Sequence, residues 1–116
     1  MVSPASFGDI FWVSLAPTFG HEIQKRRPVV VVSPTRFNRA NLPLVAPITH
    51  GAQAARAGGM AVALDGLGLK TNGVVNCSQL RSLDLEAPER NAEFIEQAPI
   101  DTMRTIVERI ADIFEF

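Results

Sequence analysis

The chain has 116 residues with a formal net charge of −1, so we expect residues 1–116 to form a single domain that buries its core without a metal or disulfide. Its one cysteine, Cys77, has no intramolecular partner, and residues 1–8 lack the basic and apolar blocks of a signal peptide. No apolar run approaches the roughly 20 residues that cross a bilayer. These features exclude a membrane-spanning chain and favour a cytoplasmic protein.

Charge is distributed unevenly between the two parts of the chain. Residues 1–81 carry 8 basic and 3 acidic side chains, whereas residues 82–116 carry 3 basic and 9 acidic ones. A local basic region can hold phosphates even in a mildly acidic protein, because charges act over a Debye length of about 8–10 Å. A solvated surface with chance asymmetry explains the same counts equally well.

Short apolar segments separated by turn residues predict a mainly β protein, a compact antiparallel barrel. The five expected strands are 9–15, 28–33, 42–49, 59–64 and 73–80. The second strand contains four consecutive valines and is expected to be buried on both faces. Pro43 and Pro47 predict that the third strand lies at an edge or a bulge.

The remaining segments predict a loop, a short strand and a terminal helix. Residues 50–58 are rich in alanine and glycine without periodicity, which predicts a mobile loop, and a short strand is expected around Phe94 and Ile95. From Pro99 onward, apolar residues recur at helical spacing, so the domain should end in an amphipathic helix. The residues with that spacing are Ile100, Met103, Ile106, Val107, Ile110, Ala111, Ile113 and Phe114.

The junction between residues 20–27 and the second strand is the first candidate site. Pro28 fixes φ where the polar, cationic segment meets the valines, so the backbone holds Arg27 in a defined place. The same segment contains His21. An arginine and a histidine together suit an anionic substrate.

Other motifs do not predict chemistry. Residues 66–71 end like a phosphate-binding loop but have Leu69, not glycine, before Lys70. Zinc is not expected, because His21, His50 and Cys77 are isolated at no ligand spacing, and no other cofactor is implied. Cys77 follows two valines in an expected strand, a position more typical of a small buried residue than of a nucleophile.

Several short motifs, taken in order, resemble the PemK/Kid branch of the MazF-like toxins. They are Gly8-Asp9-Ile10-Phe11-Trp12-Val13, Pro17-Thr18-Phe19-Gly20-His21-Glu22, Arg27-Pro28 with the valines and Ser33, Phe37-Asn38, Pro47-Ile48-Thr49 and Gly73-Val74-Val75. The resemblance covers nearly the whole chain. It implies the toxin of a type II toxin–antitoxin pair, folded as an SH3-like barrel of the CcdB/MazF/Kid type. It further implies a dimer that cuts single-stranded RNA without a metal, leaving a 2′,3′-cyclic phosphate and a 5′-hydroxyl.

The resemblance assigns catalytic roles to three residues. The family's arginine before the proline falls on Arg27, its threonine after the Pro-Ile pair falls on Thr49, and the loop histidine of the PemK/Kid branch falls on His21. Arginine suits the charge on phosphorus, and histidine transfers protons near neutral pH. An exposed loop histidine that only contacts substrate is the alternative for His21.

One segment departs from that branch. Where PemK and Kid have Arg-Cys-Asp-Gln, with the arginine and aspartate taken as catalytic, this chain has Asn76-Cys77-Ser78-Gln79. Asn76, Ser78, Gln79 and Arg81 are therefore candidates for reading bases or holding phosphates.

Two further residues are candidates for RNA contact. Phe19 either stacks on a base or closes the loop onto the barrel. His50 follows Thr49, and the resemblance implies that it faces the same groove, where it is also a candidate for proton transfer.

The expected partners are single-stranded RNA, a cognate antitoxin and a second copy of the chain, with operator DNA bound only through the antitoxin. The first alternative is a catalytically weakened protein that acts through antitoxin and operator complexes, as the residues at 76 and 78 suggest. The second is a gyrase inhibitor of the CcdB type. It is disfavoured because the chain ends Asp112-Ile113-Phe114-Glu115-Phe116 rather than in tryptophan and isoleucine.

Overall fold

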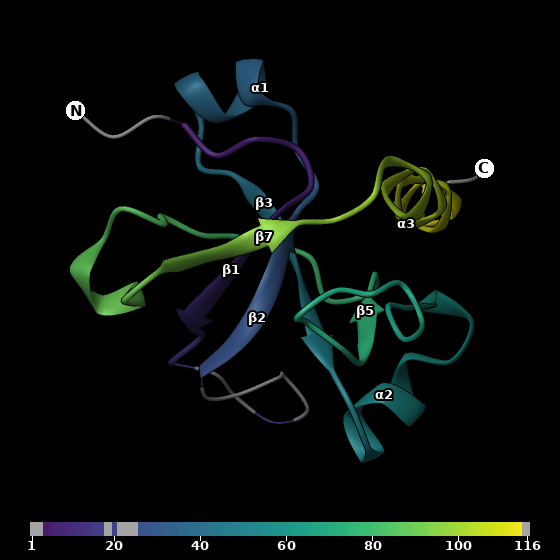
Figure 1. Ribbon diagram of the computed structural model, residues 1–116. Coiled ribbons are helices and arrows are strands. Elements are labelled where there is room, and N and C mark those ends of the chain that lie inside the picture. Colours follow the sequence, from purple (N-terminus) through teal and green to yellow (C-terminus); the bar gives the residue numbers. More distant parts are fainter. Residues whose placement is uncertain (1–3, 18–19, 21–25, 115–116) are drawn as a thin grey trace.

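The computed structural model describes residues 4–17, 20 and 26–114, and Figure 1 shows a strongly bent sheet with one long helix beside it. The strands in that part of the chain are β1 (Asp9–Ser14), β2 (Arg26–Val31), β3 (Leu44–Thr49), β4 (Ala61–Ala63), β5 (Val74–Asn76), β6 (Arg81–Ser82) and β7 (Glu93–Gln97). The helices are α1 (Thr35–Ala40), α2 (Ala52–Ala57) and α3 (Ile100–Asp112), with 3-10 turns η1 (Gly58–Met60) and η2 (Pro88–Arg90). The strands pair antiparallel in the order β4-β5-β3-β2-β1-β7, and β6 pairs with β3. The predicted fold class is confirmed.

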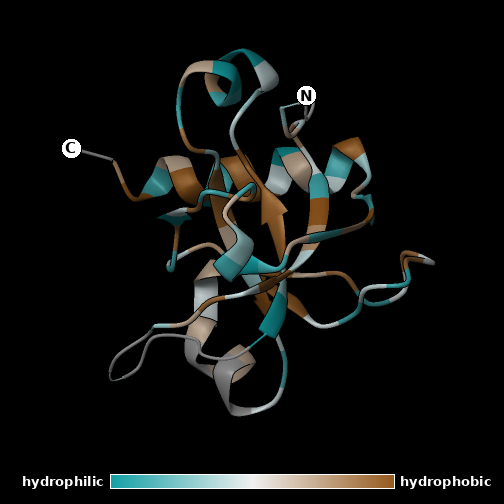
Figure 2. Cartoon of the chain, turned by 90° about the vertical axis from the view of Figure 1, so that its left-hand side faces the viewer, coloured by the Kyte–Doolittle hydropathy of each residue, from teal (hydrophilic) through white to brown (hydrophobic). Residues whose placement is uncertain are grey.

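The central strands separate two hydrophobic clusters. The helix-side core consists of Ile10, Val30, Ala46, Ile48, Val62, Leu64, Val75, Cys77, Met103 and Ile106. The inner core consists of Val13, Leu15, Val29, Val31, Val45 and Leu83. Because alternate residues of a strand point to opposite faces, the valines of β2 contribute to both clusters, as their sequence predicted. Figure 2 shows the apolar colour concentrated on these central strands.

The sheet curls over the inner core. The Arg81 Nη1 atom donates a hydrogen bond to the Leu15 carbonyl oxygen at 3.1 Å. Two strands, β3 and β2, separate β6 from β1 in the sheet, so this bond requires strong curvature. Leu83, just after β6, packs with Val13 for the same reason. This curvature gives the barrel its shape.

The two ends of the sheet path, β4 and β7, are linked by hydrogen bonds and by a helix. Glu96 of β7 accepts hydrogen bonds from Lys70 and Thr71, in the segment that joins β4 to β5. Helix α3 places Met103 and Ile106 in the helix-side core, against Val62 of β4. The helix and the β7 strand predicted around Phe94 are both confirmed. No helix in the described ranges is long and apolar enough to span a bilayer.

The expectation that β3 is an edge or bulged strand was wrong, since β3 lies between β2 and β5. Pro47 fits there because β3 changes partner: Leu44 and Val45 pair with β6, whereas Ile48 and Thr49 pair with β5. Pro47 lies between these two pairings. Its missing N–H therefore interrupts neither of them.

The expectation of a mobile loop over residues 50–58 was also wrong, because α2 occupies most of it. Its alanines have high helix propensity, and Gly51 and Gly58 take positive φ angles of 63° and 53° at its ends. Helix α1, which follows Ser33, was not predicted at all. Its Asn38 side chain donates to the carbonyl oxygens of Ala5 and Ser33, a contact that sequence periodicity does not reveal.

The predicted strand 73–80 was too long: only Val74–Asn76 form a strand, β5, and a turn separates it from β6, which begins beyond the predicted range at Arg81. The Asn76 Oδ1 atom accepts hydrogen bonds from the backbone N–H and hydroxyl of Ser78, which bends the chain after β5. Asparagine and serine favour such local turns over a continuous strand. Arg81 consequently lies on a separate strand that pairs with the start of β3.

Candidate functional site

Arg27 and Thr49 lie on the same face of the sheet at one end of the barrel. Arg27 is the second residue of β2 rather than part of the preceding loop, and Thr49 is the last residue of β3. Val29 pairs with Pro47, and Arg27 and Thr49 each lie two residues beyond this paired position on their own strands. Both share the face of the inner core, because residues two apart in a strand point the same way.

The Thr49 hydroxyl is fully buried and has no hydrogen-bond partner within the described residues. Leaving a buried polar group without a partner costs about 1–3 kcal/mol. Such groups are rare in native proteins and call for an explanation, of which a catalytic role is one. Among the described residues, the Arg26 Nη1 atom is the other buried side-chain atom without a hydrogen-bond partner.

Asn76 shares this face but is largely committed to the fold. It is buried, and its Oδ1 atom accepts the two bonds from Ser78. Since Val74 pairs with Thr49, Asn76 lies two residues further along β5 on the same face. Asn76 thus shapes the turn, and the exposed Ser78 lies on its outer side.

The other candidates differ in exposure. Gln79 and Arg81 are half-buried, and Arg81 holds the Leu15 carbonyl oxygen across the barrel, which is a structural role. His50 is exposed and directly follows β3. Phe19 and His21 lie outside the described residues.

Arg26, next to Arg27, was not singled out from the sequence. Its guanidinium carbon lies 5.8 Å from the centre of the Trp12 ring, and its Nη2 atom is 2.9 Å from the Glu93 Oε1 atom. Adjacent residues of a strand face opposite ways, so Arg26 and Arg27 serve different surfaces. The pairing of Arg26 with Trp12 depends on strand register, which no local motif encodes.

Cys77 is buried in the helix-side core, as expected from its position after two valines. Burial raises the pKa of its thiol to about 11, although the charge of Arg109 acts in the opposite direction. A thiol with this pKa is almost entirely protonated at neutral pH and is a poor nucleophile. Within the described ranges, no group of three or more His, Cys, Asp or Glu side chains is placed to hold a metal ion.

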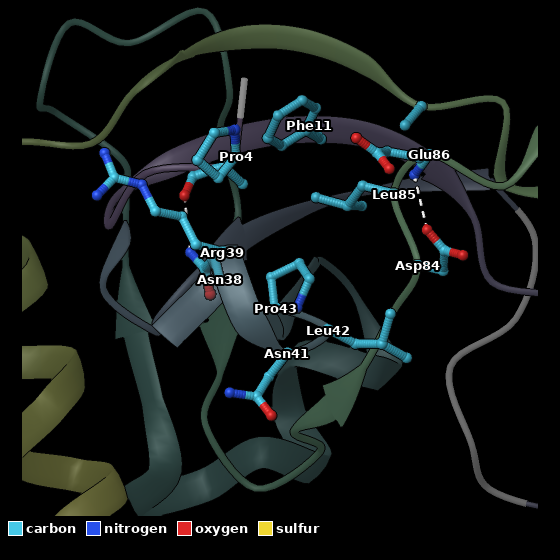
Figure 3. A pocket seen from close by; sticks show the side chains of 12 residues that line it. Pro4, Phe11, Asn38, Arg39, Asn41, Leu42, Pro43, Asp84, Leu85 and Glu86 are labelled. Carbon is cyan, nitrogen blue, oxygen red and sulfur yellow. Dashed lines mark hydrogen bonds between the residues drawn. The ribbon is translucent and has the colours of Figure 1, made fainter. Parts of the chain in front are cut away.

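A pocket of about 360 Å³ lies at the opposite end of the barrel. Its lining includes Leu42 and Pro43, which precede β3, whereas Thr49 ends that strand. Figure 3 shows Arg39 on one side of the pocket and Asp84 and Glu86 on the other. This pocket is separate from the Arg27–Thr49 end, and none of the predicted site residues that the structure describes lines it.

A curled antiparallel sheet with a terminal helix, carrying an arginine and a buried threonine on adjoining strand ends, defines a small barrel with a candidate anion site. A family model described as PemK-like, MazF-like toxin of type II toxin–antitoxin system matches residues 6–114. The chain therefore belongs to this family of toxins.

Sequence relatives and solved structures agree with this assignment. The chain is 46% identical over 107 residues to Endoribonuclease PemK of Escherichia coli, covering 91% of this chain and 79% of that protein. It is 42% identical over 90 residues to Endoribonuclease toxin ChpB of Escherichia coli (strain K12), covering 75% and 78%. The crystal structure of MazF from Deinococcus radiodurans superposes with a TM-score of 0.81, at 29% identity over 96% of both chains. A MazE-MazF crystal structure from the same organism gives a TM-score of 0.73, at 26% identity over 96% of this chain and 95% of that one.

Proposed function

We propose that this toxin is an endoribonuclease that cuts single-stranded RNA without a metal, with Arg27 and Thr49 at the centre of its active site. Two relatives above 40% identity are named endoribonucleases, which supports cleavage over the binding-only alternative. Residues 1–116 act as one toxin domain in the cytoplasm, where RNA is available. The gyrase-inhibitor alternative has no support from the family match.

The observation that carries the proposal is the Thr49 hydroxyl, which is buried, has no hydrogen-bond partner in the described part of the chain and lies on the face that also bears Arg27. A phosphate oxygen would supply the missing acceptor. Because this hydroxyl is fully buried in the free chain, RNA must part the covering side chains to reach it. The energy lost in burying the unpaired hydroxyl would then be recovered only when substrate is bound.

The reaction needs charge stabilisation on phosphorus and two proton transfers. The ribose 2′-oxygen attacks phosphorus, the bond to the 5′-oxygen breaks, and the products are a 2′,3′-cyclic phosphate and a 5′-hydroxyl. The Arg27 guanidinium can donate two hydrogen bonds to the non-bridging oxygens, and Thr49 can donate one more as negative charge builds there.

Proton transfer is assigned to histidine. The base takes the 2′-hydroxyl proton, and an acid gives a proton to the leaving 5′-oxygen. His21 is the first candidate from the family resemblance, and the exposed His50, which adjoins Thr49, is the second. Ser78 replaces an acidic residue of the PemK/Kid branch and is a poor acid or base, so it is assigned to RNA contact with Phe19 and Gln79, whereas Arg81 keeps its structural role.

The proposed protein partners follow from the solved relatives. A MazE-MazF structure with the same fold supports a cognate antitoxin for this chain, and through it an indirect contact with operator DNA. We assign the active form to a homodimer, as the family resemblance implies.

The test is cleavage of a long single-stranded RNA in the presence of a chelator, with the new end groups mapped. Wild type should cut at defined sites and leave cyclic phosphate and 5′-hydroxyl ends. Arg27→Ala should lose at least a hundredfold in rate, because a preorganised donor to a developing oxyanion contributes about 10²–10³. Arg36→Ala, an exposed arginine on α1, is the matched control and should cut normally.

Two outcomes would contradict the proposal. Equal rates for wild type and Arg27→Ala would remove the active-site assignment. No cleavage by wild type at any RNA tested would favour the binding-only alternative.

A further inference from the structure

Gly73 packs its backbone directly against the end of β3. A Cβ atom at this position would lie 2.5 Å from the Thr49 carbonyl oxygen and 2.8 Å from the His50 Cδ2 atom, closer than non-bonded atoms approach. Its φ of 107° also disfavours any side chain. The Gly73 backbone thus packs directly against Thr49 and His50, with no room for a side chain between them.

Gly73 is held from both sides by hydrogen bonds. Its N–H donates to the Asp65 Oδ1 atom at 3.1 Å, and its carbonyl oxygen accepts from the Leu64 N–H at 2.9 Å. Asp65 lies in the turn directly after Leu64, so these contacts close residues 64–73 into a loop between β4 and β5. These hydrogen bonds hold the loop in place at Gly73, the residue that contacts Thr49.

The same loop is tied to the far end of the sheet by Glu96. The Thr71 N–H and hydroxyl each donate to the Glu96 Oε2 atom at 2.7 Å, and the Lys70 N–H donates to Oε1 at 3.1 Å. Thr71 is buried, so its hydroxyl has little access to water as a substitute. A carboxylate with three donors holds its partners in a narrow geometry.

We propose that Glu96, Thr71 and Gly73 form a positioning chain that runs from β7 to the end of β3 and sets the place of Thr49 and His50. This inference rests on the proposed nuclease function for its consequence in catalysis. Glu96 and Thr71 are positioning residues that do not contact RNA. Without the Glu96 or Thr71 side chain the loop is no longer held in place, and Gly73 can move away from the end of β3. The Thr49 hydroxyl and the His50 imidazole are then misplaced.

The test compares Thr71→Val, which removes only the hydroxyl donor, with Thr71→Ser, which keeps it. Thr105→Val on α3 is the matched control, because the Thr105 hydroxyl bonds within its own helix, to the Asp101 carbonyl oxygen. Thr71→Val should lower kcat for RNA cleavage about tenfold with KM changed by less than about twofold. Misplacement by even 1 Å can cost up to about a hundredfold in rate. Thr71→Ser and Thr105→Val should keep the wild-type kcat.

A second measurement needs no cleavage. The chain has two histidines, so the imidazole NMR signals of His50 are assigned with one His50→Gln sample. They should shift in Thr71→Val and stay unchanged in Thr105→Val. Unshifted signals together with an unchanged kcat would overturn the positioning chain. If wild type cuts no RNA, the nuclease proposal fails, while the His50 signals still decide whether the loop sets the geometry.

Discussion

Replacing Thr49 with valine should make the protein more stable and much less active. The two side chains have nearly the same shape, so the change removes a buried hydroxyl that has no partner among the described residues, and it leaves no cavity. Removing the cost of burying that hydroxyl should stabilise the fold by about 1 kcal/mol, at the low end of the range for such groups. For a chain of this length that is a rise in Tm of roughly 3–6 °C.

The loss of activity is estimated from the proposed contact with the phosphate. A donor to a developing oxyanion contributes about 2.7–4 kcal/mol, so Thr49→Val should cleave RNA about 10²–10³ times more slowly. Thr49→Ser is the matched control. It keeps the hydroxyl and loses one buried methyl group, so it should lower stability by about 1 kcal/mol and keep most of the activity.

The assay pairs thermal melting with single-turnover RNA cleavage in chelator. All three proteins are melted at one concentration, because association of subunits shifts Tm. A Thr49→Val protein that melts below wild type would show that the hydroxyl has a partner in solution and would refute the prediction of higher stability. A Thr49→Val protein that cleaves at the wild-type rate would refute the contact with the phosphate.

The remaining predictions concern one residue each. Arg27→Lys keeps the charge but not the two-pronged donor geometry, so its cleavage rate should fall between those of wild type and Arg27→Ala; a wild-type rate would show that charge alone suffices. Partial burial acts to raise the pKa of Glu96, but hydrogen bonds from Thr71 and the Lys70 backbone outweigh it and hold that pKa below its usual range. The ionised Glu96 carboxylate therefore makes its full contribution to the free energy of unfolding above the unfolded pKa of about 4.3. This contribution is lost as the pH falls further. Glu96→Gln should have a free energy of unfolding about 1 kcal/mol below that of wild type at pH 7, and this difference should narrow in acid. A difference that stays the same at every pH down to acid unfolding would contradict this. Cys77, with a pKa of about 11, should resist a thiol reagent at pH 8 in the native protein and react rapidly in denaturant, and rapid native labelling would show that the helix-side core opens readily.

Local sequence patterns determined most of the strands and the terminal helix. Four consecutive valines favour a strand buried on both faces, and three of them, Val29–Val31, form the buried end of β2, which Val32 follows. Apolar residues at helical spacing after Pro99 likewise define α3, because only a helix brings them to one side. The order of short motifs predicts the family and, by resemblance, the roles of Arg27 and Thr49.

Pairing between distant strands decided the rest. Proline is rarely found in a central strand, but Pro47 is accommodated in β3 because the strand changes partner there. Nothing near Pro47 in the sequence indicates this change of partner. The burial of the Thr49 hydroxyl and the close packing of Gly73 against Thr49 both depend on strands and loops that meet only in the folded chain. The amino-acid sequence supplies the residues that are available for chemistry. Which of them share a face, and what holds them there, depends on strand register and curvature, and both are properties of the whole sheet.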